Sequence, residues 1–259
     1  MVTIQERYQE VEERIYTSAR SAKRDPDSVK LVVVTKRQPV EAVQAVIEAG
    51  AIYLGENYAE EAYEKMLALR DQLSGRSSAD RYHEIQNSTA TSQPRVVQWH
   101  IIGHVQSRKA NMVGEHFDYL HSLDSLKLAR RLDKVCEQAG RVLPVLIEMN
   151  VSGEQTKSGW DAWDEDRWSG LLPDIQAITG LPSIQVKGLM TMAPYSENPE
   201  STRPYFQRLR RLQQFLYHNA RQAEWYELSM GMSGDFEVAI EEGATWIRVG
   251  QAIMGPRPG

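Results

Sequence analysis

Lys36 is the residue whose position in the sequence most directly suggests chemistry. It follows Leu31-Val32-Val33-Val34-Thr35, a run that is apolar and mostly β-branched and is typical of a strand buried on both faces. Parallel α/β folds carry their reactive groups at the carboxyl ends of such strands. A primary amine held there can condense with a carbonyl compound to form a Schiff base. Taken alone, the pattern also fits a solvated lysine whose aliphatic stem covers apolar surface.

Two glycine-containing strand ends late in the chain could bind a phosphate group. They are Ser229-Met230-Gly231-Met232-Ser233-Gly234 and Arg248-Val249-Gly250. The glycines would let backbone N–H groups and a phosphate approach each other, a helix is expected to open at about Ser233, and the Ser233 hydroxyl adds a donor. The glycines could equally meet the needs of turns. Combined with a strand-end lysine, they indicate a site for a phosphorylated carbonyl compound, either pyridoxal phosphate or a phosphorylated aldolase substrate.

These strand ends belong to an alternation of strands and helices along the whole chain. An amphipathic helix over residues 3–23 precedes it, and the polar stretch at 74–97 is expected to be a mobile insertion loop. Eight such units in about 250 residues predict a TIM barrel, a single (β/α)8 domain over residues 1–259. A doubly wound sheet is the alternative, although it usually has fewer strands. The expected strands are Leu31–Lys36, Ile52–Gly55, Gln98–Ile102, Tyr119–Leu123, Val142–Met149, Val186–Thr191, Tyr226–Met230 and Thr245–Gly250.

Composition and charge argue against several classes of protein. The 259-residue chain has a formal net charge of −5, so no global field favours nucleic acid or an anionic membrane surface. Its single cysteine, Cys136, excludes a disulfide framework. The amino terminus lacks the apolar core of a signal peptide and no run is long enough to span a bilayer, which predicts a cytoplasmic protein. His100 and His104 fall on an expected strand and its end, so a metal site is not predicted.

The strand ends carry eight motifs in an order that resembles one known family. They are Val33–Lys36, Gly55–Tyr58, Trp99–Gln106, His121–Asp124, Asn150–Gly159, Gly188–Met192, Leu228–Ser233 and Arg248–Gly250. The resemblance covers nearly the whole chain except the stretch at 74–97. The chain is similar to the pyridoxal phosphate homeostasis protein family, also called the YggS or proline synthase co-transcribed type. This resemblance implies a fold-type III barrel like that of alanine racemase, without that enzyme's second β domain.

The resemblance also implies roles for individual residues in binding pyridoxal 5′-phosphate (PLP). Lys36 would form the Schiff base with the cofactor aldehyde, Asn57 would line the pocket near the ring, and Arg248 would face the pyridine nitrogen. The phosphate would be held by Ser233, Gly250 and the backbone of Gln251, in a turn shaped by Met230 and Gly231. At position 251 the family commonly has a threonine, so a hydroxyl contact to the phosphate would be missing in this chain.

Arg248 and the missing second domain favour a carrier over an enzyme. An arginine stays protonated, so facing the pyridine nitrogen it would leave that nitrogen unprotonated and the ring a weak electron sink. Its spacing alone would also allow an ion pair with Glu227 or another strand-end acid. We expect a monomeric, non-enzymatic protein that holds PLP covalently, delivers it to apo-enzymes and maintains vitamin B6 and amino- and keto-acid homeostasis. A PLP-dependent amino-acid racemase and a Schiff-base aldolase are the alternatives.

Overall fold

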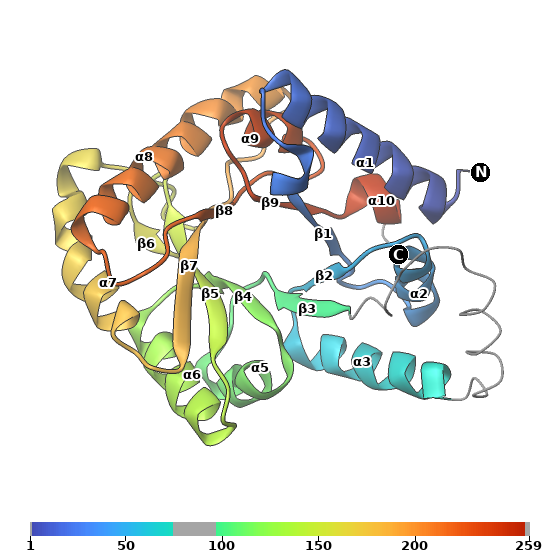
Figure 1. The fold of residues 1–259 in the computed structure, drawn as a ribbon, viewed down its shortest axis with the longest axis horizontal. Helices are drawn as coiled ribbons and strands as arrows, with labels where there is room; N and C mark the ends of the chain where they lie inside the picture. Colours follow the sequence, from blue (N-terminus) through green and yellow to red (C-terminus); the bar gives the residue numbers. More distant parts are fainter. Residues whose placement is uncertain (1, 75–96, 257–259) are drawn as a thin grey trace.

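A closed parallel barrel forms the centre of the computed structural model, which describes residues 2–74 and 97–256 (Figure 1). The strands are β1 (Lys30–Val34), β2 (Tyr53–Glu56), β3 (Gln98–Ile101), β4 (Tyr119–Leu123), β5 (Leu143–Asn150), β6 (Trp160–Asp161), β7 (Ile184–Met190), β8 (Glu227–Ser229) and β9 (Trp246–Val249). Eight of them pair in the order β1, β2, β3, β4, β5, β7, β8, β9, and β9 returns to β1. The short β6 pairs with β5 outside this ring. The TIM barrel predicted from the sequence is therefore confirmed.

Helices surround the barrel on its outer side (Figure 1). They are α1 (Ile4–Ser21), α2 (Val40–Glu48), α3 (Ala59–Ser74), α5 (Ala110–His116), α6 (Leu126–Gln138), α7 (Leu172–Thr179), α8 (Arg203–Asn219), α9 (Phe236–Glu241) and α10 (Gln251–Met254). The extra N-terminal helix α1 packs against α9 and α10. It begins with a capping box, in which the Thr3 hydroxyl accepts the Glu6 N–H and the Glu6 carboxylate accepts the Thr3 N–H.

Three helical expectations differ from the structure. α5 and α10 have no counterpart among the sequence-based expectations, because helices this short carry little periodicity. The turn at residues 231–234 leads, as the sequence predicts, into a helix over Asp235–Glu242, but α9 begins at Phe236 and not at about Ser233. Asp235 Oδ1 accepts the Met232 N–H at 2.6 Å, which closes residues 232–235 into a turn before the helix. The insertion predicted over residues 74–97 lies, apart from its first and last residues, outside the described part of the chain.

Side chains fill the interior of the barrel. Its apolar residues are Val32, Ile102, Tyr119, Leu146, Met190 and Trp246. At the amino ends of the strands, the Tyr119 hydroxyl and the Trp246 Nε1–H both donate to Glu227 Oε2, and the Lys30 ammonium lies 3.1 Å from Glu227 Oε1. A packed, hydrogen-bonded interior gives the carboxyl ends of the strands a rigid floor.

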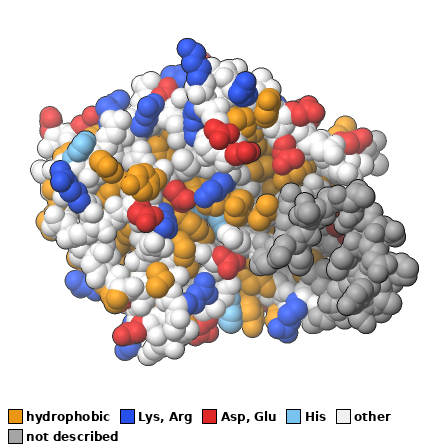
Figure 2. All heavy atoms as spheres, in the orientation of Figure 1, with side chains coloured by type: hydrophobic (Ala, Val, Ile, Leu, Met, Phe, Trp, Pro, Cys, Tyr) orange, Lys and Arg blue, Asp and Glu red, His pale blue; other side chains and the backbone are white. Residues whose placement is uncertain are grey.

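Charged side chains of both signs are interspersed on the face shown in Figure 2. Arginines on the basic helix α8 are paired with acids: Arg203 contacts Glu200, Glu241 and Glu242, and Arg211 contacts Glu165. Among the described helices, none combines the length and the apolar character that crossing a bilayer requires.

Candidate functional site

A cavity of about 470 Å³ opens at the carboxyl ends of the barrel strands, which is a typical size for a small-molecule site. Six of the eight cofactor residues expected from the sequence line it: Lys36, Asn57, Ser233, Arg248, Gly250 and Gln251. Lys36 follows β1 and Asn57 follows β2, whereas the other four belong to the last two strands of the ring and the turns after them. The closure of β9 onto β1 therefore brings the two ends of the chain together around one space.

Met230 and Gly231 do not line this cavity and instead lie behind it. The Met230 side chain is completely buried in the core. Gly231 has φ +92°, and a Cβ at that position would lie 2.6 Å from the Ala239 Cβ, so glycine is required there. Its carbonyl accepts the Arg248 N–H at 3.0 Å, which ties the turn after β8 to β9.

Three polar groups converge where the phosphate was expected. Ser233 Oγ accepts the N–H groups of Gly250 and Ala252, each at 3.3 Å. A Cβ on Gly250 would lie 3.2 Å from the Val34 Cβ, so glycine lets this backbone lie close to β1. Converging backbone N–H groups and a hydroxyl form the kind of concavity that binds anions. This concavity is made by the turn after β8 together with Gly250 and the first turn of α10, and does not use the N-terminus of α9.

Arg248 lies at the bottom of the cavity, with 4% of its surface exposed. Its Nη1 donates to Ser229 Oγ at 2.6 Å and its Nη2 donates to the Thr191 carbonyl at 2.9 Å. Burial lowers the pKa of Arg248 to about 10, which leaves it protonated at neutral pH. The alternative ion pair with Glu227 is wrong, because that carboxylate is held by Lys30, Tyr119 and Trp246 at the amino ends of the strands.

Two buried histidines extend the hydrogen bonds of Arg248 into the barrel. His121 Nδ1 lies 2.8 Å from Ser229 Oγ, and His121 Nε2 lies 3.0 Å from His100 Nδ1. Burial lowers the pKa of both imidazoles, to about 3 for His100, so both are neutral. Because Arg248 can only donate, Ser229 Oγ accepts from it and has its own proton left to donate. The arrangement that leaves the fewest polar groups unpaired is the one in which Ser229 donates to His121 and His121 donates to His100. The buried Nε2 of His100 then carries a proton without an acceptor.

Glu148 is a residue of the cavity that sequence reasoning missed. It lies near the carboxyl end of β5 and is 3% exposed. Burial, assisted by the nearby Asp124 charge, raises its pKa to about 7, while Arg248 and His104 oppose the rise. The signal was available, since an acid within the apolar run Val142–Met149 is unusual. Met232, Gly234, Ser158 and Met192 fall within strand ends or motifs noted in the sequence, whereas no pattern indicated Pro194, Tyr195, Ser196 and Thr202, which also line the cavity.

The raised pKa of Glu148 predicts a specific pH dependence of stability. A carboxyl group that binds its proton more tightly in the folded state stabilises the fold below its ordinary pKa of 4.5, and this contribution is lost as the pH rises through about 7. Relative to Glu148→Gln, the wild-type free energy of unfolding should therefore fall by about 2 to 3 kcal/mol between pH 5 and pH 8. Urea unfolding of both proteins across this range measures the difference. Parallel pH profiles would contradict a titration of Glu148.

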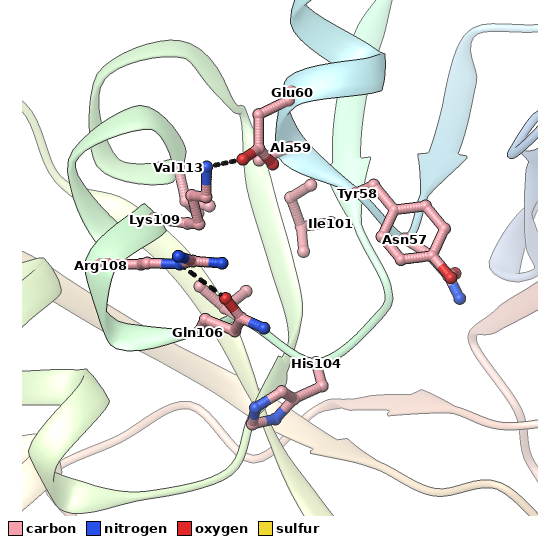
Figure 3. Close-up of a pocket in the computed structure, with 11 residues that line it drawn as sticks. Asn57, Tyr58, Ala59, Glu60, Ile101, His104, Gln106, Arg108, Lys109 and Val113 are labelled. Atoms are coloured by element: carbon pink, nitrogen blue, oxygen red, sulfur yellow. Dashed lines mark hydrogen bonds and ion pairs between the residues drawn. The ribbon is translucent and has the colours of Figure 1, made fainter.

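A second cavity, of about 440 Å³, adjoins the first and shares Asn57 and His104 with it. Figure 3 shows Arg108 and Lys109 extending across it, with Arg108 Nε donating to Gln106 Oε1 at 2.8 Å and Lys109 paired with Glu60. His104 Nδ1 lies 2.6 Å from Asp124 Oδ2. Within residues 2–74 and 97–256, no three His, Cys, Asp or Glu side chains are grouped so that they could hold a metal ion.

Comparison with known proteins agrees with this geometry. The family model described as "Alanine racemase, N-terminal domain" matches residues 9–258. A protein of Vibrio alginolyticus named pyridoxal phosphate homeostasis protein is 35% identical, over 99% of this chain and 99% of its own. The structure of PipY from Synechococcus elongatus with PLP bound is 33% identical, has a TM-score of 0.74, and is matched over 95% of this chain and 100% of PipY.

Alanine racemase of Clostridium difficile shares the fold at 14% identity, with a TM-score of 0.64 over 96% of this chain. The match spans 60% of the racemase chain, so much of the larger enzyme has no counterpart in the alignment. Full-length identity above 30% to the homeostasis protein outweighs this fold likeness. The chain therefore belongs to the pyridoxal phosphate homeostasis protein family, within the wider group that contains the alanine racemase N-terminal domain.

Proposed function

We propose that this protein binds PLP in the 470 Å³ cavity and holds or delivers it in vitamin B6 homeostasis, without catalytic turnover of an amino acid. The observation that carries the proposal is one cavity lined by an amine, a buried guanidinium and a cluster of N–H and hydroxyl groups. These groups match the aldehyde, the pyridine nitrogen and the phosphate of PLP. The solved PipY, whose printed description includes bound PLP, supports the same ligand.

Each end of the cofactor would have a distinct set of partners. Lys36 would supply the amine for covalent attachment, and Asn57 would lie beside the ring. Ser233 and the N–H groups of Gly250, Gln251 and Ala252 would surround the phosphate, while Met230 and Gly231 would support that turn from behind. Gln251 lacks the hydroxyl of threonine, but its backbone N–H is unaffected by the side chain.

Arg248 is the residue that argues against amino-acid chemistry. Bound PLP supplies an aldehyde that condenses reversibly with primary amines, and a ring that can accept electrons when its nitrogen is protonated. Arg248 would leave that nitrogen unprotonated, because a guanidinium donates a hydrogen bond but keeps its proton, and Ser229 and Thr191 hold this one in place. The ring would remain a weak electron sink, which suits storage better than catalysis. Delivery to apo-enzymes, a monomeric state and a cytoplasmic location remain predictions.

Replacing Ser233 with alanine is expected to weaken PLP binding. The change removes a hydrogen bond to a charged group, worth about 1.5–3 kcal/mol, so the dissociation constant should rise roughly 10- to 150-fold. Equilibrium dialysis of the apo-protein against PLP measures this constant. Ser21→Ala, at the exposed end of α1 and outside the cavity lining, is the matched control and should bind like the wild type. Equal affinity of the Ser233→Ala protein would place the phosphate elsewhere.

A further inference from the structure

Three charged side chains, two of them buried and one half-buried, lie together beneath the turn that carries Lys36. The Lys65 ammonium, on α3, lies 2.8 Å from Glu56 Oε1 at the end of β2 and 2.7 Å from Glu61 Oε1. The side chains of Glu56, Lys65 and Glu61 are 0%, 6% and 29% exposed, and we refer to them as the Glu56–Lys65–Glu61 cluster. Because desolvation offsets most of the attraction within a buried ion pair, stability alone is a weak reason for such a cluster.

On the N-terminal side of Lys36, the cluster holds Thr35. The Lys65 ammonium donates to the Thr35 carbonyl at 2.7 Å, and the Thr35 hydroxyl donates to Glu56 Oε1 at 2.7 Å. The Thr35 N–H donates in turn to the Gly55 carbonyl of β2 at 3.0 Å. The carbonyl of the peptide plane that precedes Lys36 is therefore held by Lys65, and Thr35 itself is tied to Glu56 and Gly55.

On the C-terminal side of Lys36, the same cluster holds Arg37. The Arg37 N–H donates to Glu61 Oε1 at 2.5 Å, on the oxygen that also faces Lys65. This N–H belongs to the peptide plane that follows Lys36. Since peptide units are planar, fixing the planes before and after Lys36 fixes the direction in which its side chain leaves the main chain.

Arg37 is held in a conformation that its side chain disfavours. Its φ is +58°. Among the described residues, Arg37 and Lys23 are the two that have a positive φ and are not glycine. The Gln38 N–H donates to the Thr35 carbonyl at 3.1 Å, so Lys36 and Arg37 are the central residues of a tight turn. Glycine or asparagine is the usual residue at the second central position when φ is positive. Strain of this kind is found where the surroundings over-determine a functional segment.

We propose that the Glu56–Lys65–Glu61 cluster positions the Lys36 amine for attachment to the PLP aldehyde, an inference that rests on the proposed function. In that attachment the amine nitrogen forms a C=N bond to the aldehyde carbon, and the carbonyl oxygen leaves as water with the two amine protons. Neither Lys65 nor Glu61 lines the cofactor cavity, so both act through the backbone beside Lys36. The competing explanation is that the cluster only packs α3 against β2.

Glu61→Ala separates the two explanations. We expect the rate of covalent attachment of PLP, followed by visible absorbance and by borohydride trapping on the Lys36 peptide, to fall about tenfold or more, because misplacing a reacting group slows a reaction steeply. Affinity for pyridoxine 5′-phosphate, which has an alcohol in place of the aldehyde, should stay within about twofold because the cavity itself is intact. Glu61→Gln keeps an oxygen for the Arg37 N–H and should recover most of the rate.

Glu60→Ala is the matched control, one residue earlier on α3. Glu60 pairs with Lys109 at the second cavity and contacts neither neighbour of Lys36, so its loss should change neither measurement. An unchanged attachment rate in Glu61→Ala would overturn the proposal. So would a parallel loss of attachment rate and pyridoxine 5′-phosphate affinity, which would show that the cluster only maintains the cavity.

Two further results keep the tests distinct. If the wild-type protein bound neither PLP nor pyridoxine 5′-phosphate, this result would refute the proposed function itself, and the positioning role with it. If Glu61→Ala did not fold, amide hydrogen exchange in the wild-type protein would decide. The Arg37 N–H should then exchange more slowly than is usual for the amide of a turn residue. A rate as fast as that of an unbonded surface amide would refute the contact with Glu61.

Discussion

The Lys36→Ala protein should carry no fixed cofactor after treatment with PLP and borohydride. Among the described residues, Lys36 is the one lysine that lines the cavity in which we propose that PLP binds. The other lysine near this turn, Lys65, is held in the Glu56–Lys65–Glu61 cluster and donates to the Thr35 carbonyl. The visible absorbance band of the loaded protein should disappear together with the adduct. Peptide mapping by mass spectrometry after reduction locates the adduct in the wild-type protein.

Lys157→Ala provides the control for this loss. Lys157 belongs to the motif Asn150–Gly159 and precedes the lining residue Ser158, but does not itself line the cavity. Its ammonium pairs with Glu154 and donates to the Met192 carbonyl at 3.1 Å. Its replacement should leave the adduct in place. Far-ultraviolet circular dichroism should show that Lys36→Ala folds like the wild type. An adduct found only on a different lysine of the wild-type protein would refute the assignment.

The PLP-loaded protein is expected to show no efficient racemisation of alanine or other common amino acids. A racemase removes a proton from one face of the substrate Cα and returns it on the other, so it needs a base on each side. Lys36 could serve one face, but neither strand-end candidate for the other is enclosed in the cavity with it. Tyr58 lines the second cavity rather than the first, and the His104 side chain, which lines both, is 58% exposed to solvent. A missing general base alone costs roughly 100- to 10,000-fold in rate.

Deuterium incorporation at Cα, combined with chiral analysis over a panel of amino acids at saturating PLP, measures this activity. Arg248 adds to the barrier because the ring it faces would be a weak electron sink. Slow exchange between the cofactor and free amino acids is compatible with a carrier. A turnover of roughly 1 per second or more, absent from Lys36→Ala, would instead establish a racemase.

Much of the barrel could be predicted because short apolar strands alternate with helices along the whole chain. Lys36, Ser233 and Gly250 could be predicted because each follows an expected strand, and parallel strands bring their carboxyl ends to one side. The helix over Asp235–Glu242 was predicted to within a residue at each end, but its N-terminus does not reach Ser233, because Asp235 captures the Met232 N–H. Hydropathy patterns do not register a single hydrogen bond of this kind.

The parts of the site that depend on burial were beyond the sequence alone. Glu148 acquires its raised pKa from its surroundings in the cavity, and a sequence pattern carries no dielectric information. Likewise, Lys65 and Glu61 read as an ordinary exposed i, i+4 pair on a helix. Only the fold shows that they reach the backbone on either side of Lys36.

The closure of β9 onto β1 also has a consequence for biosynthesis. The register pairs Lys30 with Trp246 and Val32 with Arg248, so the ring depends on contacts between residues separated by most of the chain. Such long-range pairing makes folding slow and leaves open strand edges until it is complete. During translation, β1 and β8 would expose these edges to other chains until the ribosome had released β9. Since β9 also carries Arg248, an unfinished chain would lack the floor of the proposed PLP site, and we expect PLP to bind only after the barrel closes.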